Sequence, residues 1–453
     1  MKNKKILVLL KIYKGDINPF DECALEYALN IPNSEVISLA MAPLSAKASL
    51  ERVTRLGSKA ILLCDPSYAG SDTIATANIL SKAIEYINPD LVFAGRKSVD
   101  GNTAQTPIMI SEITGYELIS NVVDVKDGKA INREKESFEI KDKQILSFEK
   151  SKVLRSPSIF SEVKEVEILS NKNLNVEKGL IGQHGSKTIV RKTYVNENGR
   201  RFCDFYEKDQ LDYLINLGLS KRENQSETTS QSIAVIYYVG NIEKVCLNFT
   251  KNAIKLDFEN KPLEEICKEI KNINPKIILW EENHICKELA CRVAIKMGIG
   301  LCAECTDVRC INNKIIITRP AIGGDIMADI ECISPISMAT IRKVEESDDI
   351  SFVVGKGAVP YLDKIKALAN KYNAKIYCTR PLADNGVIDY LYQVGLSGIN
   401  ITPHVCVTFG VSGSVQTIVG LNKSKTVISI NKVRKEKIFD YSDYGIVTDI
   451  KDI

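Results

Sequence analysis

The sequence of 453 residues lacks the features that would direct it to a membrane or to a polyelectrolyte. It has no uninterrupted apolar stretch of about 18 residues, the length that a membrane-spanning helix requires. Its 60 Lys and Arg residues nearly balance its 57 Asp and Glu residues, so no overall charge attracts nucleic acid or an anionic membrane. We therefore expect no membrane insertion, no nucleic-acid binding, and partners that are recognised through local surfaces.

Signals for secretion are absent as well. The apolar run from Ile6 to Leu10 is too short for the core of a signal peptide and is typical of a strand. The 13 cysteines are odd in number and scattered through expected strands and helices, unlike a disulfide framework. We expect a cytoplasmic protein whose thiols stay reduced.

Metal and hydrolase chemistry have little support. Cys302 and Cys305 lie three residues apart on an expected strand, so we expect their side chains to point to opposite faces of the sheet. Cys310 follows, but no fourth ligand is spaced nearby, and we interpret these residues as buried structural thiols. The three histidines are isolated in the sequence, and no GxSxG motif accompanies them.

The most informative feature that is present is an internal repeat. Residues 87–133 and 273–319 both run from Ile-Asn-Pro through an apolar strand into a helix that ends near a glycine, Gly115 or Gly298. Both then continue into a strand that ends in Asp-Val and a two-residue hairpin turn, Asp-Gly in the first copy and Asn-Asn in the second. Strands that alternate with helices predict two related α/β domains with mostly parallel sheets.

A different α/β unit follows the two copies. From residue 346 to 453, four expected strands each end in small, hydroxyl or basic residues, and such strand ends converge on one edge of a doubly wound sheet. The segment 196–231 contains the polar run SKRENQSETTSQS, which is typical of a linker. We expect a nucleotide-binding α/β domain at 1–195, a linker at 196–231, a second α/β domain at 232–345 and a doubly wound domain at 346–453.

Turns rich in glycine and hydroxyl groups indicate where ligands could bind. The turn Gly410-Val-Ser-Gly413 would let a phosphorylated ligand approach the backbone, although tight packing of a strand against a helix explains it equally well. In the first copy, polar turns at residues 18–21, 70–73 and 95–105 could face one crevice. Simple helix capping is an equal alternative for these turns.

Longer stretches of the chain resemble a known family. The order TRPLADNGVIDYLYQVGLSG, VTFGVSGSVQTIVGLNKSKTVISINK and DYGIVTDI is similar to the FAD-binding C-terminal domain of the electron-transfer flavoprotein alpha subunit. The stretch GIGLCAECTDVRCINNKIIITRPAIGGDIMADI resembles the N-terminal domain of that subunit, and INPFDECALEYAL, AGSDTIATA and GRKSVDGNTAQT resemble the beta subunit. The chain thus resembles a fusion of the beta (N-terminal) and alpha (C-terminal) subunits.

The resemblance implies an FAD site in the last unit. Arg380 would lie against the isoalloxazine and favour the reduced, anionic flavin, because a guanidinium cannot be deprotonated; a surface arginine before a proline is the alternative. Ser397 would offer its hydroxyl near the redox edge of the flavin. The implied FAD contacts are Lys356, Thr379, Arg380, Gln393, Val394, Gly395, Ser397, Ser412, Gly413, Ser414, Val415, Gln416, Thr417, Asn431 and Asp449.

Several positions depart from the family pattern. Lys356 stands where the family has an arginine, which keeps the charge but loses a bidentate phosphate contact. Leu396 replaces a common glutamine and Thr417 a common histidine, and we expect the loss of the histidine to make the flavin harder to reduce. The partner-recognition region from Leu154 to Val166 lacks the usual basic pattern.

The resemblance also implies a second nucleotide in the first unit, either AMP or, as in electron-bifurcating members, a second FAD. The run Asp-Gly-Asn-Thr-Ala-Gln at 100–105 is more like the pattern of the bifurcating members. The implied residues are Asn18, Pro19, Phe20, Asp21, Asp72, Thr73, Ser98, Asp100, Gly101, Asn102, Thr103 and Gln105.

Three functions are consistent with these implications. The first is a cytoplasmic electron carrier that receives electrons from an acyl-CoA dehydrogenase-type flavoenzyme, as in fatty acid β-oxidation, and passes them to a redox acceptor protein by movement of the domain after residue 345. The second is an NADH-oxidising, electron-bifurcating component with a second FAD. The third is a non-redox regulator that binds an adenine nucleotide and has lost flavin. The departures from the family pattern at Leu396 and Thr417 are consistent with this alternative.

Overall fold

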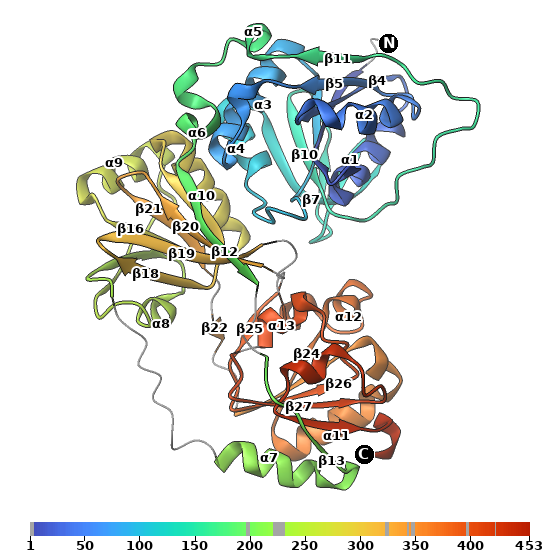
Figure 1. Cartoon of the computed structure of the whole chain (residues 1–453), viewed down its shortest axis with the longest axis vertical. Coiled ribbons are helices and arrows are strands. Elements are labelled where there is room, and N and C mark those ends of the chain that lie inside the picture. The colour runs from blue at the N-terminus through green and yellow to red at the C-terminus, as the bar shows by residue number, and fades with distance from the viewer. Residues whose placement is uncertain are drawn as a thin grey trace.

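The computed structural model describes residues 4–195, 200–220, 232–321, 326–341, 344–345, 349–395, 398–421 and 423–453. Figure 1 shows three lobes that follow one another along the chain, each built around a β-sheet. In the described part of the chain, no helix has both the length and the apolar character needed to cross a bilayer.

The first lobe contains a nine-stranded sheet in the order β11-β5-β4-β1-β6-β10-β7-β8-β9. It is parallel from β11 to β7, and β8 and β9 continue it as antiparallel strands. The strands are β1 (Lys4–Leu10), β4 (Ser34–Met41), β5 (Lys59–Leu63), β6 (Leu91–Gly95), β7 (Glu117–Lys126), β8 (Lys129–Asn132), β9 (Ser137–Glu139), β10 (Gln144–Phe148) and β11 (Val166–Leu169). The covering helices are α1 (Pro19–Leu29), α2 (Lys47–Thr54), α3 (Thr73–Ile87) and α4 (Thr106–Thr114).

The second lobe has a parallel sheet in the order β15-β14-β16-β21-β17 and an antiparallel sheet in the order β12-β20-β19-β18. The parallel strands are β14 (Ile236–Val239), β15 (Ala253–Lys255), β16 (Ile277–Glu281), β17 (Gly300–Cys305) and β21 (Ser337–Ile341). The antiparallel strands are β12 (Thr188–Val195), β18 (Asp307–Ile311), β19 (Lys314–Ala321) and β20 (Ile326–Cys332), and the main helices are α9 (Leu263–Ile273) and α10 (His284–Met297).

The internal repeat is confirmed by strand order. The run β4-β1-β6-β10-β7 in the first lobe matches β15-β14-β16-β21-β17 in the second, with α4 and α10 at equivalent places. Both helices end at a left-handed glycine, Gly115 or Gly298, as predicted. Buried side chains of α4 and α10 belong to one apolar core, so the two lobes pack through the repeated helix.

The third lobe is a doubly wound parallel sheet in the order β13-β28-β27-β26-β23-β24, as the sequence predicted. From β23 the chain runs to β24 on one side and then returns to β26 on the other, so the switch point lies between β23 and β26. The strands are β13 (Asp204–Tyr206), β23 (Ile350–Val354), β24 (Lys375–Cys378), β26 (Val405–Phe409), β27 (Thr426–Asn431) and β28 (Tyr444–Val447). The helices are α7 (Leu211–Ser220), α11 (Leu362–Tyr372), α12 (Arg380–Asp384) and α13 (Val415–Leu421).

The segment between the first two lobes differs from the expected linker. Strand β12, which we assigned to the first domain, pairs with β20 of the second lobe. Strand β13 pairs with β28, and α7 buries Leu211, Leu214 and Ile215 in the core of the third lobe. Figure 1 shows these green elements among the yellow and red ones. Residues 188–195 therefore belong to the second lobe and residues 204–220 to the third, and residues 196–199 and 221–231 lie outside the described part.

Candidate functional site

Two strand-ending turns meet at the switch point of the third lobe. Gly355 follows β23, and a Cβ atom on it would lie 2.3 Å from the carbonyl oxygen of Gly410, which follows β26. Gly410 itself has φ of +59°, a conformation that favours glycine. Because neither residue has a side chain, the two turns can touch. Both glycines line a cavity in front of the strand ends.

This cavity, the third-lobe cavity, has a volume of about 660 Å³. Several residues of the implied FAD set line it, which brings together the ends of four strands. They are Lys356, Thr379, Ser412, Ser414, Thr417, Asn431 and Asp449. Other lining residues stand outside the implied FAD set, of which Tyr361, Lys432, Glu436 and Thr448 are polar. Tyr361 ends a 3-10 turn that begins at Lys356, and only Lys356 of this turn belonged to the implied FAD set.

Hydrogen bonds fix the polar rim of the third-lobe cavity. The Asp449 carboxylate accepts from the backbone N–H of Lys451 and from the Tyr361 hydroxyl, and these bonds hold the pKa of Asp449 below its usual value. The same contact raises the pKa of Tyr361. Asn431 donates to the carbonyl oxygen of Val411 (3.0 Å), so its side chain shapes the turn after β26.

Other residues of the implied FAD set support the cavity from behind. Gln393 and Val394 are buried, with 1% of their surface exposed. A Cβ on Gly395 would lie 2.4 Å from the carbonyl oxygen of Gln416, and one on Gly413 would lie 2.2 Å from the backbone nitrogen of Ile438. The implied residues that do not line the cavity are Arg380, Gln393, Val394, Gly395, Gly413, Val415 and Gln416. Ser397 and Leu396 lie outside the described residues.

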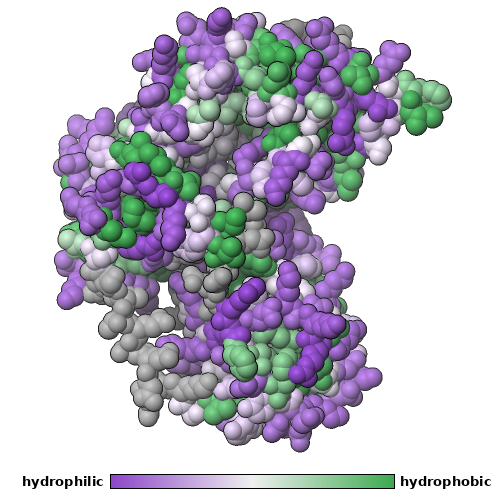
Figure 2. Space-filling model, viewed as in Figure 1, coloured by the Kyte–Doolittle hydropathy of each residue, from purple (hydrophilic) through white to green (hydrophobic). Residues whose placement is uncertain are grey.

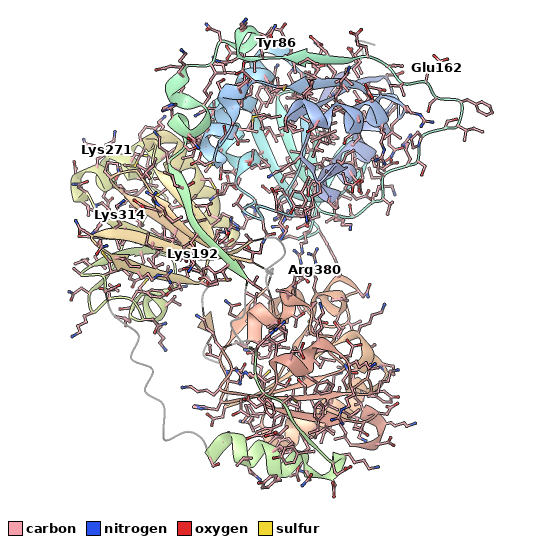
Figure 3. The ribbon with its side chains drawn as sticks, viewed as in Figure 1. Tyr86, Glu162, Lys192, Lys271, Lys314 and Arg380 are labelled. Carbon is pink, nitrogen blue, oxygen red and sulfur yellow. The ribbon has the colours of Figure 1, made fainter. Side chains whose placement is uncertain are left out.

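Arg380 stands beside the third-lobe cavity at the start of α12. It follows Thr379 and precedes Pro381, which both line the cavity. Its Nε lies 3.2 Å from Asp384 Oδ2, and 39% of its side chain is exposed. Figure 3 places Arg380 on the side of the third lobe that faces the first lobe. The side chain therefore sits between the cavity and the neighbouring lobe.

The third-lobe cavity fits a dinucleotide. Its volume is within the range of ordinary ligand and cofactor pockets, and it lies at the switch point where doubly wound sheets bind such ligands. Lys356 supplies a cation, Ser412 and Ser414 supply hydroxyl donors, and the glycine turns leave room for a close approach to the backbone.

A second cavity, the first-lobe cavity, has a volume of about 420 Å³ and lies at the equivalent switch point between β1 and β6. The Asp21 carboxylate braces this point by accepting from the backbone nitrogens of Lys11 (2.7 Å) and Gly95 (2.9 Å). Burial raises the pKa of Asp21 to about 7, although these hydrogen bonds lower it. Apolar side chains from β1, β4 and α3 form one wall of the cavity.

Most residues of the implied second nucleotide site reach the first-lobe cavity. Those that line it are Asn18, Asp21, Asp72, Thr73, Ser98, Gly101, Thr103 and Gln105. Pro19, Phe20, Asp100 and Asn102 do not line it. Asp100 instead pairs with Lys11 (2.7 Å), and Asn102 donates to Glu304 of the second lobe (2.8 Å).

Several of the lining groups hold the protein together. Asp72 caps α3 through Ala75 and accepts from the backbone nitrogens of Lys187 and Thr188, so its carboxylate is occupied. The Oε1 atom of Gln105, in contrast, is buried without a hydrogen-bond partner among the described residues. It is available to accept from a ligand.

Lys97 is a cation that sequence reasoning did not assign to the first-lobe cavity. It lines the cavity, and burial lowers the pKa of its ammonium group to about 7. Glu304 opposes this shift, whereas Arg96 reinforces it. Lys97 lies in the turn at 95–105 that the sequence predicted to face a ligand. Its place in that turn could have identified it as a residue of the site.

The cysteines are all free thiols, and no group of three or more His, Cys, Asp or Glu side chains in the described residues could hold a metal ion. One expectation about them is wrong. Cys302 pairs with Ala339 of β21, and Cys305 pairs with Ile341. The two cysteines are three residues apart on β17 and their partners are two residues apart on β21, so β17 contains a β-bulge. Residues two steps apart on a strand face the same side, and the two thiols therefore meet.

Comparisons with known proteins agree with this arrangement. Residues 6–148 and 263–347 match the electron transfer flavoprotein domain, and residues 346–422 match the electron transfer flavoprotein FAD-binding domain. The chain is 37% identical over 194 residues to the electron transfer flavoprotein subunit beta of Thermoanaerobacterium thermosaccharolyticum, covering 39% of this chain and 75% of that subunit. It is 29% identical over 237 residues to the alpha subunit of the same organism, covering 42% and 71%.

A third relative is named for a different activity. The lactate dehydrogenase (NAD(+),ferredoxin) subunit LctC of Acetobacterium woodii is 30% identical over 230 residues, which cover 41% of this chain and 55% of that subunit. The matches to beta and alpha subunits together span the three lobes. The chain belongs to the electron transfer flavoprotein family, with beta-type and alpha-type subunits joined in one polypeptide.

Proposed function

We propose that this chain carries electrons between a flavin dehydrogenase and a redox acceptor protein, with FAD held in the third-lobe cavity. The observation that carries the proposal is the convergence of Lys356, Ser412 and Asp449 on one cavity at the switch point. Bound FAD would supply the redox chemistry. The protein itself would act as a carrier rather than as a stand-alone catalyst.

The residues in and beside the cavity divide into two groups by chemistry. Lys356 and the hydroxyls of Ser412 and Ser414 suit the pyrophosphate, because they offer positive charge and hydrogen-bond donors. Arg380, at the edge that faces the first lobe, suits the isoalloxazine and would favour its anionic reduced state. Hydrogen bonds from the Lys451 N–H and the Tyr361 hydroxyl lower the pKa of Asp449 further, so its carboxylate stays negatively charged near this ligand.

The donor would dock on an apolar loop of the first lobe. Residues 151–165 expose Val153, Ile159 and Phe160 almost completely, with 88% of Phe160 accessible. Figure 2 shows apolar side chains at the right-hand tip of the first lobe, and Figure 3 labels Glu162 of this loop there. Exposed large apolar side chains in a group mark surfaces that bind other proteins. An acyl-CoA dehydrogenase-type flavoenzyme is the partner that we propose.

The first-lobe cavity would hold an adenine nucleotide. Apolar side chains on one wall suit a base, and Lys97, Ser98 and Thr103 suit a phosphate. Gln105 Oε1 would accept from the amino group of the adenine. We propose AMP as the occupant.

A second candidate function is favoured by a neighbouring cavity of about 210 Å³. It shares Arg96, Ala104 and Pro107 with the first-lobe cavity, so the two spaces adjoin and a ligand longer than AMP could extend between them. A second FAD in this space would support NADH-dependent electron bifurcation. The similarity to the lactate dehydrogenase (NAD(+),ferredoxin) subunit LctC supports this candidate.

Nucleotides released by acid from the purified chain distinguish the candidates. We expect one FAD and one AMP per chain, and no loss of flavin absorbance when NADH is added without a partner. Two FAD per chain with bleaching by NADH would instead establish the bifurcating function. A chain that stays colourless after incubation with excess FAD would overturn both.

A further inference from the structure

The bulge in β17 brings together the thiols of Cys302 and Cys305, and electron transfer through FAD does not require this contact. Glu304, inside the bulge, has φ of +57°, and the thiols of Cys302 and Cys305 lie beside each other. Cys305 Sγ donates to the carbonyl oxygen of Cys302 at 3.2 Å. A disulfide requires Cβ atoms roughly 3.5–4.5 Å apart, so a bond between the two sulfurs would draw the two ends of the bulge together.

A buried arginine lies near this pair of thiols. Arg319 of β19 is 5% exposed, and its Nε and Nη2 atoms have no hydrogen-bond partner among the described residues. An arginine cannot lose its proton, and a buried charge without a partner is costly. The guanidinium acts electrostatically on both Cys302 and Cys305. A thiolate on one of them would supply a counter-charge, and no described residue forms an ion pair with Arg319.

The two sulfurs are not equivalent. The hydrogen bond from Cys305 lowers the pKa of Cys302, and Arg319 adds to this effect. Burial raises the pKa of Cys305, as it does for Cys291, whose pKa rises to about 12. Cys302 is therefore the attacking sulfur and Cys305 the resolving one.

We propose that Cys302 and Cys305 form a reversible dithiol–disulfide switch that a small peroxide oxidises. The Cys302 thiolate attacks one peroxide oxygen, the O–O bond breaks, and Cys302 becomes a sulfenic acid while the leaving oxygen takes up a proton. Cys305 then attacks the sulfenic sulfur, the S–O bond breaks, and the Cys305 proton leaves with the hydroxyl as water. With hydrogen peroxide, two thiols give one disulfide and two waters. A dithiol reductant reverses the change.

The switch is connected to the first lobe through the bulge. Glu304 accepts from Asn102 Nδ2 at 2.8 Å, and Asn102 belongs to the turn at 95–105 beside the first-lobe cavity. A disulfide would tighten the bulge and move the Glu304 carboxylate. Nucleotide affinity would then depend on the redox state, a consequence that rests on the proposed nucleotide function of that cavity.

Mass spectrometry of the purified full-length chain tests the switch directly. After treatment with hydrogen peroxide, we expect the tryptic peptide that contains both Cys302 and Cys305 to lose two hydrogen atoms, and dithiothreitol to restore its mass. Because both sulfurs are buried, we expect a bulky alkylating reagent to label neither in the native protein. Peroxide treatment that leaves both thiols unchanged would overturn the proposal.

Variants assign the two roles. In Cys305→Ser, the sulfenic acid on Cys302 should persist and be trapped by dimedone added together with denaturant after the peroxide is removed, whereas Cys302→Ser should give no adduct on Cys305. Arg319→Met should slow Cys302 oxidation severalfold, because the positive charge that favours the Cys302 thiolate is lost. Cys291→Ser, in a buried cysteine of α10, is the matched control and should leave the disulfide unchanged. Equal trapping at both positions would contradict the assigned roles.

Binding of fluorescent AMP to the oxidised and reduced chain then tests the connection to Asn102. We expect the affinity to change severalfold, and Asn102→Ala to abolish the difference. Equal affinities in the two redox states, with the disulfide demonstrably formed, would remove the connection but leave the switch intact. Absence of AMP binding in both states would instead count against the proposed nucleotide site.

Discussion

The guanidinium of Arg133 lies over the ring of Tyr390, with 3.6 Å between its central carbon and the ring centroid. Arg133 follows β8 in the first lobe, and Tyr390 belongs to the third lobe, shortly after α12. Arg133 also faces Glu149, which pairs with Arg96 at 2.8 Å. Since Arg96 lines the first-lobe cavity, a line of contacts joins that cavity to the flavin-binding lobe.

Tyr390→Leu should loosen the third lobe from the first. A cation–π contact is worth about 0.5–2 kcal/mol, depending on how far it is shielded from water. Because electron transfer would require this lobe to move, we expect a broader distribution of distances between spin labels on the two lobes, and faster reduction by the donor. Arg434→Ala is the matched control, since Arg434 makes a similar contact with Phe205 within the third-lobe sheet region (4.1 Å). A distribution that matches the unmodified chain would show that the contact does not restrain the lobe.

Arg380→Ala should make the FAD potential more negative. A fixed positive charge beside the flavin stabilises the anionic reduced state, and its partial exposure weakens the effect. We expect a decrease of roughly 60 mV, which corresponds to a tenfold change in the one-electron equilibrium. Redox titration measures it, with Arg380→Lys expected to retain part of the effect. If the potential of Arg380→Ala is unchanged, Arg380 does not act on the flavin.

Local sequence patterns predicted much of the fold for a physical reason. The hairpin turn at Asp127 and Gly128 and the one at Asn312 and Asn313 have positive φ at both residues, which few other residue types adopt readily. The strands of the third lobe are apolar runs that end in small or polar residues, and chain connectivity alone brings their ends together. Such features depend on neighbours in sequence.

Long-range features escaped prediction. The partners of Asp72 are 115 and 116 residues away, so helix capping was the only role that its neighbours suggested. The bulge that joins Cys302 and Cys305 depends on Glu304 in a conformation that its residue type does not favour. Helix α7 could have been predicted, because Leu211, Leu214 and Ile215 have the spacing of an apolar helix face. The polar run that follows the helix led us to predict a linker for the whole segment.

Lys97→Met should weaken nucleotide binding in the first-lobe cavity and remove its coupling to protons. The Lys97 pKa of about 7 means that the side chain is partly neutral near neutral pH. A bound phosphate would favour the charged form, so binding at pH 8 should take up a proton. Calorimetry in buffers of different ionisation enthalpy measures this uptake. We expect about tenfold weaker binding and no uptake in the variant.

Lys59→Met provides the control for Lys97. Lys59 is exposed, pairs with Glu35 at 2.5 Å and lies on β5, away from the lining of the first-lobe cavity. Its replacement should leave both affinity and proton uptake unchanged. Proton uptake that survives in Lys97→Met would assign the titration to another group.

Phe160→Asp should impair electron transfer from the partner without affecting folding. The side chain is 88% exposed, so its loss removes little buried surface within the chain. Central apolar side chains dominate the energy of protein interfaces, and we expect the KM for the dehydrogenase to rise about tenfold. Phe202→Asp is the matched control, because Phe202 is equally exposed but lies outside the loop. An unchanged KM would move the docking surface elsewhere.

Asp21→Asn should change how stability depends on pH. The folded-state pKa of about 7 is above the ordinary value of 3.8, because burial disfavours the carboxylate. The native chain therefore binds more protons than the unfolded chain between about pH 4 and pH 7, and stability falls as pH rises through this window, by on the order of 1 kcal/mol per unit. Urea unfolding at several pH values should show this decline in the unmodified chain and not in the variant.

The Asp21→Asn variant carries a separate cost that pH does not alter. An asparagine has one acceptor oxygen, so one of the backbone N–H groups of Lys11 and Gly95 loses its partner, at about 1–3 kcal/mol. Asp65→Asn is the control: hydrogen bonds from Ser67 lower the pKa of Asp65, so its contribution is lost only as pH falls below the ordinary range. The stability difference between the unmodified chain and Asp65→Asn should thus be flat from pH 5 to pH 8, whereas that with Asp21→Asn should decline up to about pH 7. A flat difference for Asp21→Asn would show that Asp21 is already ionised in the folded chain.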